Sequence, residues 1–145
     1  MTALAASYDP KRKDGELIRY PLAAGVRVFK GALTCVVSAT GFLEPAADVA
    51  GVVFAGVAFE EANNGTGGVQ YDGSVSSGAA GVESVLVQTR GVFQYHKSGA
   101  VQADVGKAAF VLDDNTVSTV ATTDNVRVGV VVGLVDAGMV AVRIG

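Results

Sequence analysis

The sequence has 145 residues and a mass of 14.6 kDa, which fits one domain rather than two. Half of the residues are hydrophobic, but no apolar run reaches the roughly 18 residues of a membrane span, and the single Cys35 excludes an intramolecular disulfide framework. The chain contains 27 Val and 19 Gly against 2 Ile. Valine favours strands and glycine marks turns and bulges, so the composition predicts a β-protein.

The charged residues are unevenly distributed along the chain. The net charge of −3 disfavours a protein that coats nucleic acid. Residues 1–30 hold six basic and three acidic side chains, whereas the remaining residues hold five basic and 11 acidic ones. The pattern predicts a basic arm that precedes an acidic body.

The first predicted element is an extended arm that covers residues 1–24. This segment shows no sustained alternation of apolar and polar residues, and Asp9-Pro10 and Tyr20-Pro21 favour extended or turn geometry. It also lacks the long apolar region of a signal peptide. The body, residues 25–145, is predicted to be a single β-domain.

Short apolar segments separated by turn residues fill the body. Residues 49–60 are almost continuously apolar and predict a strand covered on both faces. The polar, glycine-rich residues 61–81 predict either one large loop or a short hairpin through Val69-Gln70-Tyr71. Further strand segments are predicted at residues 82–95, with a break at Gly91, and at residues 108–112, 117–120, 126–135 and 139–144. This spacing indicates an antiparallel β-sandwich or barrel.

A weak internal echo links the two parts of the body. Residues 31–37 resemble residues 106–112, and Gly51-Val-Val resembles Gly129-Val-Val after a gap. The echo has two explanations: two similar halves, or the general likeness of strands rich in valine and glycine.

No set of residues predicts catalysis or metal binding. The lone His96 has no second histidine with which to build a zinc site, and Cys35 lies in an apolar run typical of a buried thiol. Asp113-Asp114 is better explained by turn chemistry than by cation binding. We therefore expect no enzyme activity, no cofactor and no metal.

The basic arm supplies the candidate contact residues. The cluster Lys11-Arg12-Lys13 is either a solvated terminus or an electrostatic tether that finds an acidic neighbour, including another copy of the same body. Arg19 and Tyr20, at the end of the arm, complete the candidate contacts with a partner or a second subunit.

The body also resembles a known family in the order of its strand and turn motifs. The segments that carry the resemblance are GVRVFKGALTCV (residues 25–36), TGFLEPA (40–46), GVAFEEANN (56–64), RGVFQY (90–95), VGKAAFVLDDNTV (105–117), GVVVGLVD (129–136) and VAVRI (140–144). In these residues the chain is similar to the capsid cement, or decoration, proteins of tailed bacteriophages. The likeness covers about four-fifths of the sequence and fades in residues 1–24.

The resemblance implies a β-rich, jelly-roll-like or barrel-like body on the outer surface of the phage head. Such proteins are made in the bacterial host cytoplasm, bind the major capsid protein as homo-oligomers and stabilise the contacts between its subunits. A dimer and a trimer are both compatible with the sequence. No nucleic-acid or membrane partner is expected.

Two other classes of function remain open. One is a different structural subunit of the phage, such as a head fibre or a tail tube. The other is a small β-barrel enzyme or a carbohydrate-binding module, although the absence of Trp and an aromatic content of 7% disfavour a platform for sugar stacking.

Overall fold

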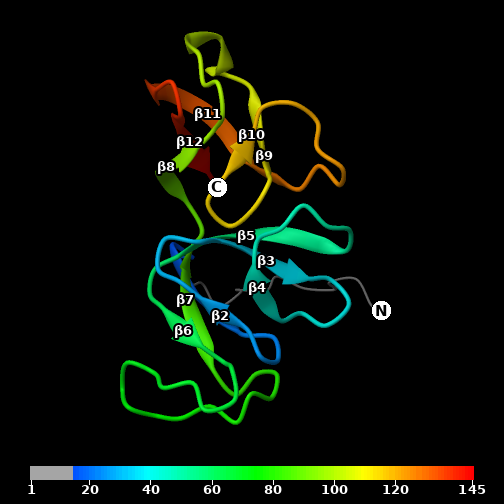
Figure 1. Ribbon diagram of the computed structural model, residues 1–145, viewed down its shortest axis with the longest axis vertical. Coiled ribbons are helices and arrows are strands. Elements are labelled where there is room, and N and C mark those ends of the chain that lie inside the picture. Colours follow the sequence, from blue (N-terminus) through cyan, green and yellow to red (C-terminus); the bar gives the residue numbers. More distant parts are fainter. Residues whose placement is uncertain (1–14) are drawn as a thin grey trace, which may run out of the picture.

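The computed structural model describes residues 15–145, and within that range it contains twelve β-strands, one short 3-10 helix and no α-helix. All the sheet ladders are antiparallel. The predicted all-β, antiparallel fold is therefore confirmed. Two large sheets are arranged like a sandwich, one in each half of the molecule (Figure 1).

The first sheet occupies the lower half of Figure 1 and has the strand order β1-β7-β5-β3-β4. Its strands are β1 (Leu17–Pro21), β3 (Leu33–Val37), β4 (Leu43–Pro45), β5 (Val52–Ala58) and β7 (Ser84–Gln88). A separate two-stranded pair, β2 (Arg27–Val28) and β6 (Ala62–Asn63), packs against one face of this sheet through Val28 and Ala62.

The second sheet follows in the chain and has the order β10-β9-β11-β12-β8. Its strands are β8 (Gly91–His96), β9 (Ala108–Val111), β10 (Val117–Ser118), β11 (Arg127–Asp136) and β12 (Met139–Ile144). The 3-10 helix η1 (Gln102–Asp104) lies between β8 and β9. These strands coincide closely with the segments predicted from the alternation of apolar residues.

The two sheets have the same topology. When the five strands of each sheet are numbered by their place in the chain, both sheets read 1-5-4-2-3. In each one, a parallel bridge also links the end of the first strand to the start of the third, Leu22 to Leu43 and His96 to Thr116. The body thus consists of two similar units, residues 15–89 and residues 90–145.

A matching bulge and a matching glycine support this equivalence. In both units the second and fourth strands pair with a one-residue shift, beside Gly56 in β5 and beside Gly129 in β11. A Cβ atom on Gly56 would overlap the carbonyl oxygen of Gln88, and one on Gly129 would overlap that of Arg143. Both positions therefore need glycine because the neighbouring strand's backbone approaches too closely for a side chain.

The internal echo therefore reflects two similar units. The sequence similarity of its second part, however, joins residues that are not structurally equivalent. In sequence, Gly51-Val-Val resembles Gly129-Val-Val, whereas in the structure Gly56 is the equivalent of Gly129. Both Gly51 and Gly56 precede valine, so the letters alone do not choose between them. The bulge and the strand partners decide the register.

Two hydrophobic clusters hold the units together. The first lies on one face of the first sheet and includes Leu22, Leu43 and Val85. The second fills the other unit, and Leu33 and Val57 of the first unit join it from the opposite face of the first sheet. Burying a Val or Leu side chain contributes about 1.5–3 kcal/mol, so this shared cluster joins the units firmly.

The end of the expected arm is part of the first sheet. Strand β1 pairs along its whole length with β7, from Leu17 opposite Gln88 to Pro21 opposite Ser84. The chain before it is anchored at Gly15, whose carbonyl oxygen accepts a hydrogen bond from the Thr89 hydroxyl, and Glu16 pairs with Arg90. Lys11, Arg12 and Lys13 lie outside the described residues.

Candidate interaction surfaces

The two described candidates from the arm differ in their surroundings. Arg19 is half-exposed, and its Nη1 atom lies 3.3 Å from Glu60 Oε1 and 3.3 Å from Ser84 Oγ. Tyr20 is half-buried and packs against the first hydrophobic cluster. Arg19 is thus held at the surface by a neighbouring carboxylate, while much of the Tyr20 ring supports the fold.

The long connection between β5 and β7 distinguishes the first unit from the second. In the second unit, the equivalent strands β11 and β12 are joined directly by a turn at Ala137-Gly138, where the Gly138 N–H donates to the Asp136 carboxylate over 2.8 Å. In the first unit, the connection spans residues 59–83 and contains β6. We call residues 63–79 of this connection the loop.

Hydrogen bonds hold the base of the loop in place. The side chain of Asn64 is fully buried, and its amide donates to the carbonyl oxygens of Ala23 and Ala79, each over 2.9 Å. Its own oxygen accepts a 2.6 Å hydrogen bond from the buried Ser76 hydroxyl. Because every polar atom of the Asn64 side chain has a hydrogen-bond partner, the polar sequence folds into a loop of defined conformation.

The tip of the loop carries exposed apolar side chains. A bridge between Val69 and Val75 forms a small hairpin, and Gln70 and Ser74 share a backbone hydrogen bond of 2.8 Å inside it. Of the two alternatives for this segment, one large loop or a short hairpin through Val69-Gln70-Tyr71, the structure contains the hairpin. Val69 and Val75 are each more than 60% exposed, and the ring of Tyr71 is completely exposed.

Beside this tip lies a cleft of about 610 Å³. Its apolar lining comes from Phe59, Ala62, Val69 and Tyr71, with Glu60, Glu61 and Lys30 among the charged residues around it. A second depression adjoins it, shares Glu60, Glu61, Gln70 and Tyr71, and is completed by Arg19, Asp72 and Glu83. We call the two depressions together the trough.

Two of the four carboxylates in the trough are already paired with arginines. Glu60 is paired with Arg19, and Glu61 is paired with Arg27. Asp72 and Glu83 form no ion pair with any residue in the described range 15–145. The trough therefore combines four apolar side chains with a net negative end, while Lys30, which forms no ion pair within residues 15–145, lines only the first depression.

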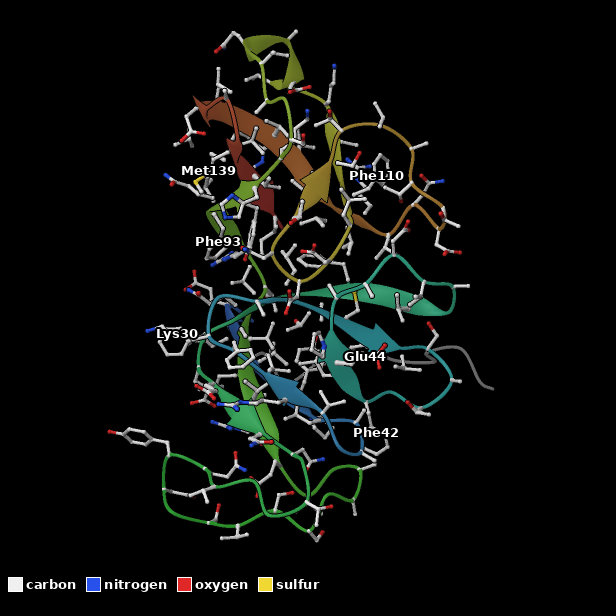
Figure 2. All side chains as sticks on the ribbon, in the orientation of Figure 1. Lys30, Phe42, Glu44, Phe93, Phe110 and Met139 are labelled. Atoms are coloured by element: carbon white, nitrogen blue, oxygen red, sulfur yellow. The ribbon has the colours of Figure 1, made fainter. Side chains whose placement is uncertain are left out.

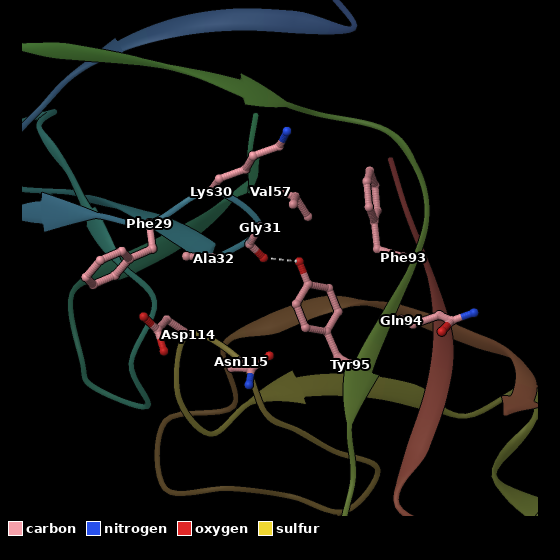
Figure 3. A pocket seen from close by; sticks show the side chains of 10 residues that line it. All are labelled: Phe29, Lys30, Gly31, Ala32, Val57, Phe93, Gln94, Tyr95, Asp114 and Asn115. Atoms are coloured by element: carbon pink, nitrogen blue, oxygen red, sulfur yellow. Dashed lines mark hydrogen bonds between the residues drawn. The ribbon is translucent and has the colours of Figure 1, made fainter. Parts of the chain in front are cut away.

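A different cleft, of about 440 Å³, lies at the junction of the two units. Figure 3 shows Tyr95 of the second unit reaching Gly31 of the first, with Lys30, Val57 and Phe93 around the same cleft. The Tyr95 hydroxyl donates a 2.8 Å hydrogen bond to the carbonyl oxygen of Gly31, and burial together with the nearby Asp114 charge raises the pKa of Tyr95. Figure 2 shows Lys30 and Phe93 on the same side of the molecule. The Tyr95 hydrogen bond thus connects the two units at their junction.

Sequence reasoning missed a buried ionic cluster in the second unit. Asp104 is 3% exposed and accepts a 3.0 Å hydrogen bond from the Val101 N–H. Its Oδ2 atom lies 3.1 Å from Lys97 Nζ, and its Oδ1 atom lies 3.3 Å from Lys107 Nζ. The Val101 N–H, and then the Lys97, Thr119 and Lys107 side chains, hold the pKa of Asp104 well below its usual value. No motif could reveal this cluster because its members converge only through the fold around η1.

A second aspartate links the two units. Asp48, in the first unit, accepts hydrogen bonds from the Thr122 hydroxyl at 3.0 Å and from the backbone N–H groups of Thr123 and Asp124 at 2.9 Å each. These bonds, with that from Asp124 N–H as the largest cause, lower the pKa of Asp48. The carboxylate therefore acts as a clamp between a loop of each unit.

The remaining sequence candidates occupy structural positions. Cys35 is fully buried, and burial raises the pKa of its thiol to about 11. His96 is exposed at the end of β8. Asp113 accepts a 2.8 Å hydrogen bond from the Asn115 N–H, so the predicted turn chemistry is confirmed.

Comparison with known proteins gives no family. No family model matches the sequence, and no curated protein or solved structure shows significant similarity to it. Within residues 15–145, no group of three or more His, Cys, Asp or Glu side chains is arranged to hold a metal ion. The same part of the chain contains no helix long and apolar enough to cross a membrane.

Proposed function

We propose that this chain is a capsid cement protein of a tailed bacteriophage, which binds the outer surface of the head and stabilises contacts between major capsid protein subunits. The order of strand and turn motifs along residues 25–145 supports the proposal. The function would be binding, carried out by surfaces and by no catalytic group.

The observation that carries the proposal is that both units present apolar side chains to solvent from a rigid β scaffold. In the first unit, Val49 is 43% and Val53 is 62% exposed. In the second, Val120 is 69% exposed, and Leu134 and Val135 are exposed near the β11–β12 turn. A protein that bridges two neighbouring subunits needs at least two separate contact surfaces, one for each subunit.

The packing of the units fits this role. Leu33 and Val57 join the core of the second unit, and the Asp48 clamp ties the adjacent loops. Because the shared cluster and the clamp couple the units, two surfaces on them can hold their partners at a defined separation. Many copies on one shell would multiply modest individual affinities through multivalency.

Cosedimentation with capsids tests the proposal. The purified protein is mixed with expanded shells, with unexpanded shells and with isolated capsid protein, and the pellets are quantified. We expect binding to expanded shells, because only they present adjacent subunits in their final arrangement, and no complex with isolated subunits. Absence from the pellet of expanded shells would refute the cement function, and rings or open polymers of the protein alone would indicate a tail or fibre subunit.

The contribution of the exposed valines can be separated from folding. Val53→Ser and Val120→Ser should leave the melting temperature nearly unchanged, because both side chains are largely exposed. Each should nevertheless reduce the number of copies bound per expanded shell. The matched control is Val111→Ala, which removes fully buried apolar volume and should lower stability instead.

A further inference from the structure

The trough beside the loop has the chemistry of a peptide-binding groove. The apolar part of its floor includes Phe59, which is 44% exposed. The Tyr71 ring stands fully exposed beside it, and the open end carries Asp72 and Glu83. The base of the loop is fixed by the buried Asn64–Ser76 hydrogen bond of 2.6 Å. A peptide would therefore meet a preformed surface and would not need to order it.

One segment of this protein matches that chemistry. Lys11, Arg12 and Lys13 supply three consecutive positive charges, and the apolar or aromatic residues Leu4 and Tyr8 precede them in the sequence. The only negative charges of the trough that lack an ionic partner among residues 15–145 are those of Asp72 and Glu83. A basic cluster next to apolar residues is thus complementary to an acidic end next to an apolar floor.

Chain length decides whether the basic cluster belongs to the same molecule. The described chain begins at Gly15, beside Thr89 at one end of the β1–β7 pair. Glu83 lies at the other end, where its carbonyl oxygen accepts a hydrogen bond from Leu22 N–H. The chain runs seven residue steps from Gly15 to Leu22 in nearly extended form, so their Cα atoms lie about 23 Å apart.

The three basic residues Lys11, Arg12 and Lys13 cannot all reach Glu83 of their own molecule. Lys13 is two residues from Gly15 and Lys11 is four, so their Cα atoms lie at most about 7 Å and 14 Å from it. The chain would also have to reverse direction, which uses some of these residues. Glu83 of the same copy is therefore out of reach for the three charges together, although Arg19, which also lines the trough, is only four residues from Gly15.

We propose that the trough binds the basic N-terminal segment of a second copy of this chain. The segment's Lys11-Arg12-Lys13 cluster faces Asp72 and Glu83, and its apolar residues cover Phe59 and Tyr71. The inference assigns a surface to the self-contact that the proposed cement function calls for. It is tested on the protein alone, so its failure and the failure of shell binding are separate results.

Charge-swap variants of the full chain test the contact. Sedimentation equilibrium measures self-association of wild type, of Lys11→Glu/Arg12→Glu/Lys13→Glu, of Asp72→Asn/Glu83→Lys, and of the two sets combined. Asn is chosen at position 72 because the side chain accepts a 2.9 Å hydrogen bond from Ser74 N–H, which an amide oxygen can also accept. Each set alone should weaken association at least about tenfold, and the combination should recover part of the loss.

Two controls separate this contact from general charge effects. Asp113→Asn/Asp124→Lys changes the net charge by the same amount as the trough variant, but at exposed positions of the second unit, and should leave association unchanged. Tyr71→Ser removes an exposed ring without touching the core and should weaken association by about tenfold, the scale of an aromatic anchor. Added salt should weaken the wild type most.

Crosslinking decides which copy supplies the segment. Equal amounts of ¹⁴N- and ¹⁵N-labelled protein are mixed and treated with a zero-length carboxyl-to-amine reagent, and peptides that join Lys11 or Lys13 to Asp72 or Glu83 are analysed by mass. We expect mixed-isotope pairs in about half of these products, as random pairing between copies requires. Pairs confined to a single isotope would overturn the proposal, as would a wild type that stays monomeric or a swap that rescues nothing.

Discussion

Two aspartate carboxylates, of Asp104 and Asp48, each hold several groups from distant parts of the chain together. Asp104 gathers Lys97, Lys107 and Thr119 around η1, and Asp48 joins the two units through three hydrogen bonds. Neither residue stands out in the sequence, because an isolated aspartate beside a turn is common in any surface loop. Their roles come from long-range contacts that only the fold creates.

The lowered pKa values of Asp48, Asp72 and Asp104 predict how stability depends on pH. A carboxyl whose pKa is lower in the folded state stabilises the fold above its unfolded-state pKa of about 3.8. This contribution is lost as the pH falls below that value toward the folded-state pKa. We expect the melting temperature to be steady between neutral pH and about pH 5 and to fall steeply below about pH 4.

Asp104→Asn tests this origin directly. The variant should melt below the wild type at neutral pH, because its amide cannot compensate Lys97 and Lys107. It should also show a shallower loss of stability between about pH 4 and pH 2. Asp124→Asn is the control, because the Asp124 side chain accepts no hydrogen bond from the described residues, and its acid profile should follow the wild type. Identical profiles for both variants would exclude Asp104 as a source of the acid sensitivity.

At the scale of the elements, the strands were predictable and their partners were not. Alternation and valine content located β5, β7 and the five strands of the second unit, because each has apolar residues that face a core. The two-residue strand β6, within the polar segment 61–81, left no pattern that could be recognised. Strand β1 was placed in the arm because Tyr20-Pro21 interrupts the alternation, although the edge position of β1 tolerates proline.

The bulge glycines give a sharp test of the duplicated topology. Gly56→Ala and Gly129→Ala should each destabilise the protein by at least about 1–3 kcal/mol, because the new methyl group would overlap a backbone carbonyl of the adjacent strand. Gly133→Ala, also in β11, should stay within about 0.5 kcal/mol of wild type, since its nearest neighbour would be the Ala141 Cβ at 3.7 Å. Urea unfolding measures all three, and equal costs at Gly129 and Gly133 would contradict the close approach of the strands.

The loop should depend on the buried hydrogen bond at its base. Ser76→Ala leaves the side-chain oxygen of Asn64, Oδ1, buried without its donor, which should cost about 1–3 kcal/mol. The neighbouring Ser77→Ala removes an exposed hydroxyl and should change stability by less than about 0.5 kcal/mol. Hydrogen exchange should also show faster opening of residues 64–79 in Ser76→Ala only. Unaltered exchange would mean that the loop is held by other contacts.

At the scale of the whole molecule, the two units divide the charge between them. Residues 15–89 carry seven acidic and three basic side chains, while residues 90–145 carry five of each. The acidic excess thus belongs to the first unit, which also holds the trough. The sequence predicted an acidic body and a basic arm, but the concentration of unpaired acids beside an apolar floor appears only when the connection between β5 and β7 is folded.

The candidate interaction surfaces were only partly predictable for the same reason. An exposed valine cannot be distinguished from a buried one in the sequence, and half of the residues are hydrophobic. Composition therefore does not show which hydrophobic residues lie on the surface and which lie in the core. The loop tip was predictable because Val69-Gln70-Tyr71 stands alone among turn residues. The cleft beside it was not, because Phe59 and Ala62 come from the end of β5 and from β6.

The most direct test of the central claim is a cryo-electron microscopy reconstruction of expanded capsids incubated with this protein. The account predicts ordered density for both units on the outer surface of the shell, with residues of the first and the second unit touching different capsid subunits. Density inside the shell, at the tail, or contacting only one capsid subunit through one unit would contradict it.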